Sequence, residues 1–142
     1  MNTLIETHLP TCLLLAAGGQ LFIALLGPMI PRLLNWKEPI AAMPLLVREV
    51  FHVHTFFIAL TCAIFGVITW RFASELASPP HELMRWFAAS VGLFWGIRCV
   101  MQWTTYSAVH WRGLPWKTLA HWTLFLGYGA FAITYLTAAF RP

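Results

Sequence analysis

Four polar residues stand at every fourth position of the apolar stretch RCVMQWTTYSAVH, namely Arg98, Gln102, Tyr106 and His110. Residues four apart on a helix are neighbours, so Arg98 can contact Gln102, and Gln102 can contact Tyr106. Each such step turns the side chain by about 40°, so Arg98 and His110 diverge by roughly 120°. We therefore predict a ligand-binding site at Arg98, Gln102 and Tyr106, with His110 outside it.

Histidines provide a second group of candidate ligands, because four of the six fall near the same end of the predicted helices. Glu49 and His52 have the Glu-x-x-His spacing of di-metal helix bundles, although a second such pair is absent. A mononuclear metal site would use Glu49, His52, His110 and His121. A b-type haem would be held between His54 and His121. A quinone headgroup bound by His, Gln and Tyr side chains is a further hypothesis. Histidines that merely reach interfacial water are the alternative without a ligand.

Arg98 is predicted to lie about 13 Å from the end of its helix, near the middle of a hydrocarbon layer of about 30 Å. An arginine at that depth costs about 3 kcal/mol on insertion scales, so it must face other helices or a wet cavity. None of the predicted spans contains a carboxylate. The charge of Arg98 therefore favours an anionic ligand or a partner subunit. Alternatively, Arg98 has a purely structural role, in which it forms hydrogen bonds with Gln102 and with carbonyl groups and so fixes the helices to one another.

The elements that position these residues follow from composition. Of the 142 residues, 59% are hydrophobic and 10% are charged, against about 25% charged in soluble domains. A soluble domain of this size could not bury so much apolar surface. Cys12, Cys62 and Cys99 form no CxxC motif and are interpreted as small core residues. We expect one membrane domain over residues 1–142.

Four windows of about 20 apolar residues predict membrane-spanning helices, at about 9–30, 50–70, 84–107 and 118–140. The segment between the first two windows contains three prolines and is expected to lie at the interface. The other connections are short, which favours antiparallel neighbours. The predicted fold is an all-α, up-down four-helix bundle in a membrane.

The basic residues predict how the chain is oriented in the membrane. The side with more of them carries Arg32, Lys37, Arg48, Arg112 and Lys117, and the other side carries Arg71, Arg85 and Arg141. The excess predicts that the first side is cytoplasmic and that both termini lie outside. These residues are scattered through short connections and form no basic stripe, so nucleic-acid binding is not expected.

Packing between helices is indicated by the GxxxG motif at Gly92 and Gly96, since small residues let membrane helices approach closely. The partner helix is either internal or supplied by another subunit. The tryptophans inside spans, Trp95, Trp103 and Trp122, are interpreted as packing or lipid-contacting residues. The chain contains no nucleophile elbow, Walker loop, HExxH motif or dinucleotide fingerprint.

The stretch IPRLLNWKEPIAAMPLLVREVFHVHTFFIALTCAIFGVITW, with the later WGIRCVMQ, resembles small four-helix membrane proteins of bacteria that have no assigned function. The similar features are Pro-Arg-x-Leu-x-Trp after the first span, Leu-x-Arg-Glu-Val-Phe at the start of the second, and Arg-x-x-x-Gln in the third. The resemblance implies a bacterial cytoplasmic membrane and a role for Arg98 and Gln102. It carries over no activity.

Together these features predict a small polytopic membrane protein that binds a ligand or partner through a polar cluster in one leaflet. The bilayer, other membrane subunits or further copies of the chain are the expected partners. The alternative is a haem- or metal-dependent membrane oxidoreductase that uses the clustered histidines.

Overall fold

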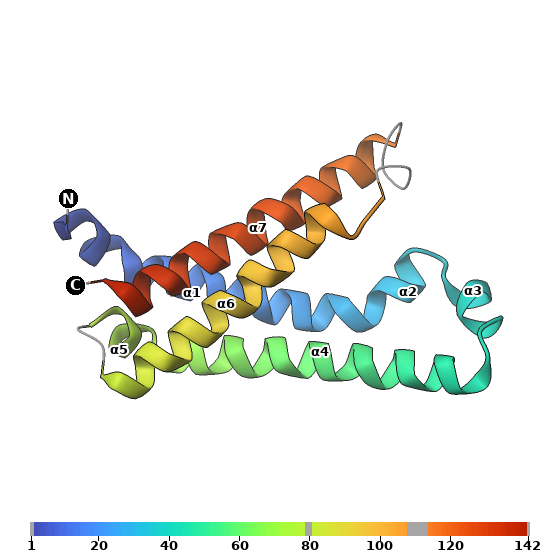
Figure 1. Ribbon diagram of the computed structural model, residues 1–142, viewed down its shortest axis with the longest axis horizontal. Coiled ribbons are helices and arrows are strands. Elements are labelled where there is room, and N and C mark those ends of the chain that lie inside the picture. Colours follow the sequence, from blue (N-terminus) through green and yellow to red (C-terminus); the bar gives the residue numbers. More distant parts are fainter. Residues whose placement is uncertain (1, 79–80, 108–113, 142) are drawn as a thin grey trace. The chain divides into compact units, whose positions relative to one another are not determined.

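The computed structural model describes residues 2–78, 81–107 and 114–141, with side chains from Thr7 onward (Figure 1). All regular secondary structure in this part of the chain is helical, which confirms the predicted all-α class. The elements are α1 (Asn2–Leu26), η1 (Gly27–Met29), α2 (Ile30–Leu33), α3 (Lys37–Ala41), α4 (Leu45–Arg71), α5 (Ala73–Ala77), α6 (Glu82–Thr104) and α7 (Pro115–Phe140).

Within the described residues, four helical segments are long and apolar enough to cross a membrane: Thr7–Leu33, Leu45–Arg71, Glu82–Thr104 and Pro115–Phe140. The shortest has 23 residues and is therefore about 34 Å long, enough for a hydrocarbon core of about 30 Å. The second span begins at Leu45, directly after Pro44, whereas the sequence predicted a start at about residue 50. Proline is favourable at the start of a helix and unfavourable in its interior, so the helix begins at this proline. The protein is a multi-pass membrane protein.

The chain divides into two compact units. The α6–α7 unit comprises residues 1–16 and 72–142, and the α4 unit comprises residues 17–71, so the division falls within α1. One domain over residues 1–142 stays a prediction.

In the α6–α7 unit, the two long helices lie side by side and antiparallel (Figure 1). The GxxxG motif faces α7 of the same chain. A Cβ atom added to Gly92 would lie 3.1 Å from the backbone nitrogen of Leu136, and one added to Gly96 would lie 3.9 Å from the Cβ of Ala132. The internal alternative for the partner helix is therefore the one observed.

Trp95 lies between the two glycines on α6 and is 2% exposed. Its ring stacks on Tyr128, with centroids 5.2 Å apart and planes at 19°, and meets Phe131 edge-on at 5.0 Å. Such aromatic pairs add about 0.5–1.5 kcal/mol to the gain from burial. Aromatic packing around Trp95 therefore lies directly beside the close backbone contacts at Gly92 and Gly96.

In the α4 unit, Gly66 is the close-approach residue. A Cβ atom there would lie 3.1 Å from the carbonyl oxygen of Ala17 and 2.9 Å from Cγ of Leu21, so α4 packs directly against the second half of α1. The chain turns between these helices through η1, α2 and α3 (Figure 1). Asn35, between α2 and α3, has φ of 55°, a left-handed conformation that asparagine adopts more readily than most residues.

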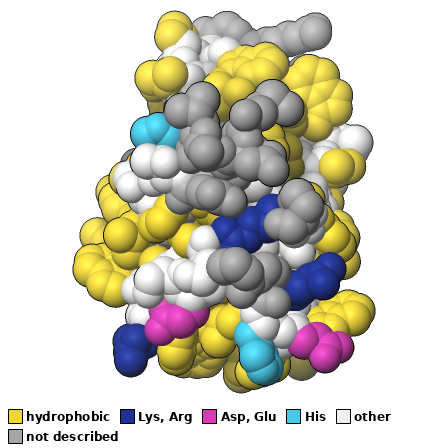
Figure 2. Space-filling model, turned by 90° about the vertical axis from the view of Figure 1, so that its left-hand side faces the viewer, with side chains coloured by type: hydrophobic (Ala, Val, Ile, Leu, Met, Phe, Trp, Pro, Cys, Tyr) yellow, Lys and Arg dark blue, Asp and Glu magenta, His cyan; other side chains and the backbone are white. Residues whose placement is uncertain are grey.

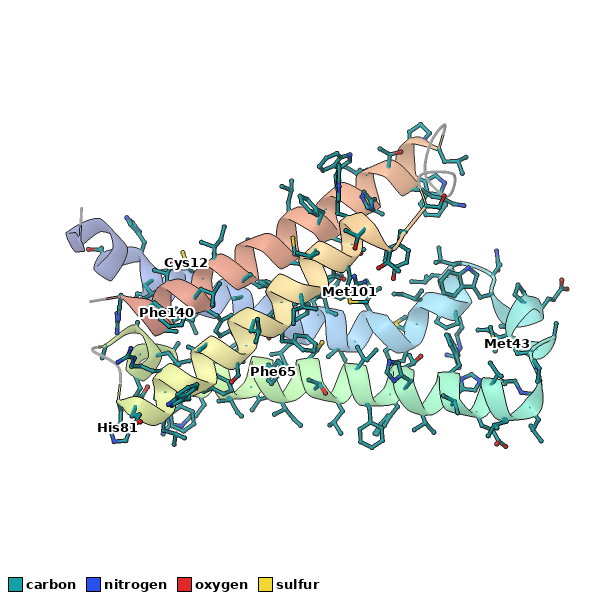
Figure 3. All side chains as sticks on the ribbon, in the orientation of Figure 1. Cys12, Met43, Phe65, His81, Met101 and Phe140 are labelled. Carbon is teal, nitrogen blue, oxygen red and sulfur yellow. The ribbon has the colours of Figure 1, made fainter. Side chains whose placement is uncertain are left out.

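Large apolar side chains are exposed along α4, whose side chains are drawn as sticks in Figure 3. They are Leu45, Leu46, Val47, Val50, Val53, Phe56, Phe57, Ile58, Leu60, Ile64, Val67 and Trp70. Hydrophobic side chains are also exposed on the face shown in Figure 2, where charged and histidine side chains lie at the surface as well. Soluble monomers rarely expose contiguous apolar surface of this extent, so these residues are suited to contact lipid.

Candidate functional site

Arg98 and Gln102 form the first contact of the candidate site, one turn apart on α6. The Arg98 guanidinium donates from Nη1 to Oε1 of Gln102 at 3.0 Å. The structure confirms the contact that the four-residue spacing predicts. Arg98 lies six residues before the end of α6, roughly 9 Å inside the helix end and not the predicted 13 Å, because α6 ends at Thr104 and not at residue 107. Met101 marks this part of α6 in Figure 3.

His121 joins the site from α7, through a contact of 3.0 Å between Nε2 of Gln102 and Nδ1 of His121. A guanidinium can only donate, so the oxygen of the Gln102 amide must face Arg98 and its nitrogen must face His121. Gln102 therefore donates to Nδ1, and a neutral His121 carries its proton on Nε2. Both side chains are buried, with 5% of Gln102 and 6% of His121 exposed. The amide thus connects a charge on α6 with an imidazole on α7.

Two tyrosine rings flank the guanidinium. Cζ of Arg98 lies 4.8 Å from the ring centroid of Tyr128 and 5.7 Å from that of Tyr106, within the range of cation–π attraction. Nη2 also approaches the hydroxyl of Tyr106 at 3.5 Å, a long contact that contributes little as a hydrogen bond. Because Trp95 stacks on Tyr128, the ring next to the charge is itself fixed by packing.

Tyr128 was not among the predicted site residues, although α7 contains a signal for it. His121, Tyr128, Ala132 and Tyr135 are buried on α7, at spacings that return to one helix face. A helical periodicity drawn through His121 therefore places Tyr128 on the same side. Trp95, interpreted from the sequence as a packing or lipid-contacting residue, does pack, and it packs against the site.

The site around Arg98 contains a positive charge and no described acidic partner. The chain contains no Asp or Glu after Glu82, which lies at the other end of α6, roughly 24 Å from Arg98 along the helix. Within the described residues, the contacts of Arg98 are to an amide oxygen, a hydroxyl and two aromatic rings. These groups stabilise a cation without neutralising it, so the positive charge is not cancelled locally.

The remaining predicted ligands are distributed over both units. Glu49, His52 and His54 are exposed on α4, in the α4 unit, whereas His121 belongs to the α6–α7 unit. His110 lies outside the described residues. Among the residues that the structure describes, no three His, Cys, Asp or Glu side chains are grouped as a metal site. The predicted metal set and haem pair therefore stay predictions.

No family model, curated protein or solved structure matches the chain. That outcome agrees with a resemblance that carries no assigned activity.

Proposed function

We propose that this membrane protein binds an anionic group of a ligand or partner subunit at Arg98, in a site completed by Gln102 and Tyr106. The observation that carries the proposal is the Arg98 guanidinium, which lies inside a span and contacts only neutral groups among the described residues. The sequence of α6 and α7 contains no carboxylate after Glu82. Charged residues at such depth are by default functional, since their desolvation is costly. A carboxylate or phosphate from outside the chain would offset that cost.

The contacts of Arg98 support binding of this kind. A guanidinium has five N–H donors, and it binds carboxylate or phosphate through two parallel hydrogen bonds. Only Nη1 makes a short described hydrogen bond, to Gln102, and this bond restricts the side chain to one orientation. Cation–π attraction to the two rings also stabilises the guanidinium, and Nη2 makes only a long contact with the Tyr106 hydroxyl. Tyr106 is 46% exposed, which leaves the side of the site nearest the helix end accessible.

The cellular setting belongs to the same proposal. The distribution of Lys and Arg supports a cytoplasmic side at the connections 31–49 and 108–117, with both termini outside. The resemblance to bacterial proteins supports the bacterial cytoplasmic membrane. In that orientation Arg98, Gln102 and Tyr106 belong to the inner leaflet, and the anionic group is supplied by a lipid-embedded ligand, another membrane subunit or a further copy of the chain.

The alternative, a haem- or metal-dependent oxidoreductase, needs a histidine nitrogen with an available lone pair. In His121 the Nδ1 lone pair accepts from Gln102, and the neutral ring carries its proton on Nε2. Ligation by His121 would require the Gln102 amide to turn over and withdraw its oxygen from Arg98. The hydrogen bonds therefore favour the anion-binding proposal.

Replacement of Arg98 tests the proposal. The full chain is extracted from its native membrane in copolymer discs, and molecules that co-purify are identified after cross-linking. Wild type and the matched control Arg85→Leu, an exposed arginine near the start of α6, are expected to retain the same anionic component. Arg98→Leu is expected to lose it, and Arg98→Lys to retain part of it. The proposal fails if Arg98→Leu retains the component at the wild-type level.

A second variant separates binding from a purely structural role. Gln102→Glu places a carboxylate next to the guanidinium, so it supplies the anion internally. We expect normal folding of this variant and loss of the external component. An absorption spectrum and metal analysis of the purified protein test the alternative, because a Soret band or stoichiometric metal would support the oxidoreductase.

A further inference from the structure

A second candidate site lies in the α4 unit, where the chain turns between α1 and α4. A cavity of about 490 Å³ is lined there by residues of η1, α2, α3 and the first turns of α4. This volume is within the range of about 300–1,000 Å³ typical of small-molecule sites. All its lining residues belong to one unit, and Arg98 belongs to the other.

Three cations line this cavity: Arg32 from α2, Lys37 from α3 and Arg48 from α4. The only carboxylates of the α4 unit, Glu38 and Glu49, are not among the lining residues. Three positive charges from three helices thus converge on one cavity, without a lining acid to neutralise them. This arrangement is selective for an anion.

Local structure holds these cations at the turn. Arg48 is partly buried and donates from Nη1 to the carbonyl oxygen of Ala41, at 3.4 Å. This long contact places the guanidinium beside the last residue of α3. Asn35, with its left-handed backbone, lies in the turn between α2 and α3, and these two helices contribute Arg32 and Lys37 to the same cavity.

Most of the other lining residues are apolar, and His52 and Thr55 are the polar ones among them. Ile40 is 7% exposed and is the buried residue of α3, while Phe51 and Phe56 line the cavity from α4. Phe56 lies eight residues beyond Arg48, hence roughly 12 Å further along α4, toward the centre of the span. Cations therefore lie at the end of a membrane helix, and aromatic rings lie deeper. This order matches an amphiphile that has an anionic headgroup and an acyl chain.

We propose that this cavity binds an anionic phospholipid, with its phosphate at Arg32, Lys37 and Arg48 and an acyl chain along Phe51 and Phe56. Basic pockets between membrane helices on the cytoplasmic side are suited to such headgroups, and basic residues near an anionic lipid surface act cumulatively. Inorganic phosphate shares the anionic chemistry, but it would make no use of the aromatic wall. A lipid is therefore the occupant that accounts for both halves of the cavity.

The test measures lipid bound to the full-length protein in detergent micelles by native mass spectrometry. Phosphatidylglycerol and phosphatidylcholine with identical acyl chains are compared. The double variant Arg32→Gln, Lys37→Gln is compared with Arg85→Gln, which removes an exposed charge from the other unit. Each lost cation is expected to weaken phosphatidylglycerol binding about fivefold, so the double variant weakens it about 25-fold. Far-UV circular dichroism checks folding, which both variants should retain because all three side chains are exposed.

Selective binding of phosphatidylglycerol that is lost in the double variant and retained in Arg85→Gln supports the proposal. Equal binding of both lipids, or an equal loss in Arg85→Gln, overturns it. Inorganic phosphate is added as a competitor. Displacement of the lipid by an equimolar amount of phosphate would show a free-anion site and would also overturn it. Arg98→Leu is expected to bind lipid like wild type, so this result does not depend on the proposed function at Arg98.

Discussion

The tight packing of α6 against α7 at Gly92 makes the substitution Gly92→Val informative. A Cβ atom at this position would lie 2.9 Å from Cγ of Leu136 and 3.1 Å from the backbone nitrogen of the same residue. The Leu136 side chain is 37% exposed and can move aside. Its backbone nitrogen is fixed in the helix, so valine at position 92 forces the two helices apart.

The magnitude follows from a comparison with Gly127 on α7, where an added Cβ would meet no atom within 4 Å. Both glycine-to-valine changes have the same difference in helix propensity, a few tenths of a kcal/mol in favour of valine. Overpacking of a tight core costs about 1–3 kcal/mol. We therefore expect Gly92→Val to be less stable than Gly127→Val by about 1–3 kcal/mol, a difference that isolates the steric term.

Reversible unfolding in mixed micelles with increasing dodecyl sulfate measures this difference. Tryptophan fluorescence reports on the same region, because Trp95 stacks on Tyr128 beside the glycine contact. Equal free energies of unfolding for Gly92→Val and Gly127→Val would refute the assignment of the GxxxG motif to packing within the chain. A dimer lost only in Gly92→Val, with unchanged stability, would assign the motif to another subunit.

Three further substitutions are expected to separate strong from weak contacts in the same unfolding assay. Gln102→Leu removes the acceptor of Arg98 and the bond to Nδ1 of His121, and it should cost about 1–3 kcal/mol. A loss below about 0.5 kcal/mol would contradict the buried network. Tyr106→Phe removes only a contact of 3.5 Å and should change stability by less than about 0.5 kcal/mol. Gly66→Val brings a side chain within 3.1 Å of a carbonyl oxygen of α1 and should cost about 1–3 kcal/mol, whereas an unchanged stability would show that α1 and α4 do not pack there.

Much of the fold was predictable because it depends on local properties of the chain. The length and apolarity of each span are set by the bilayer, so four windows of the sequence were enough to predict four helices. The contact between Arg98 and Gln102 was predictable for the same reason, since it lies within a single helix. It requires only the four-residue spacing and no knowledge of a neighbouring helix.

Contacts between helices were less predictable. His121 was predicted among the histidines at one end of the helices and not as a partner of Gln102, because the rotation of α7 about its axis decides which of its side chains face α6. Tyr128 was overlooked for this reason, because an aromatic residue in an apolar span is equally suited to lipid. The GxxxG motif was similarly ambiguous until the close approach of Gly92 to α7 was known. The cationic cavity depends on three separate helices and on the turn at Asn35, so no single stretch of sequence indicates it.

The hydrogen bond from Arg98 to Gln102 lies within one helix, and this has a consequence for biogenesis. Helices enter the membrane in the order of their synthesis, so α6 is made before α7 and before His121 is available. The guanidinium nevertheless has its amide acceptor one turn away on the same helix. The Arg98 guanidinium, whose transfer into the bilayer costs the most free energy in this span, therefore enters already hydrogen-bonded to Gln102. When α7 follows, it adds the His121 imidazole and the Tyr128 ring to this existing pair.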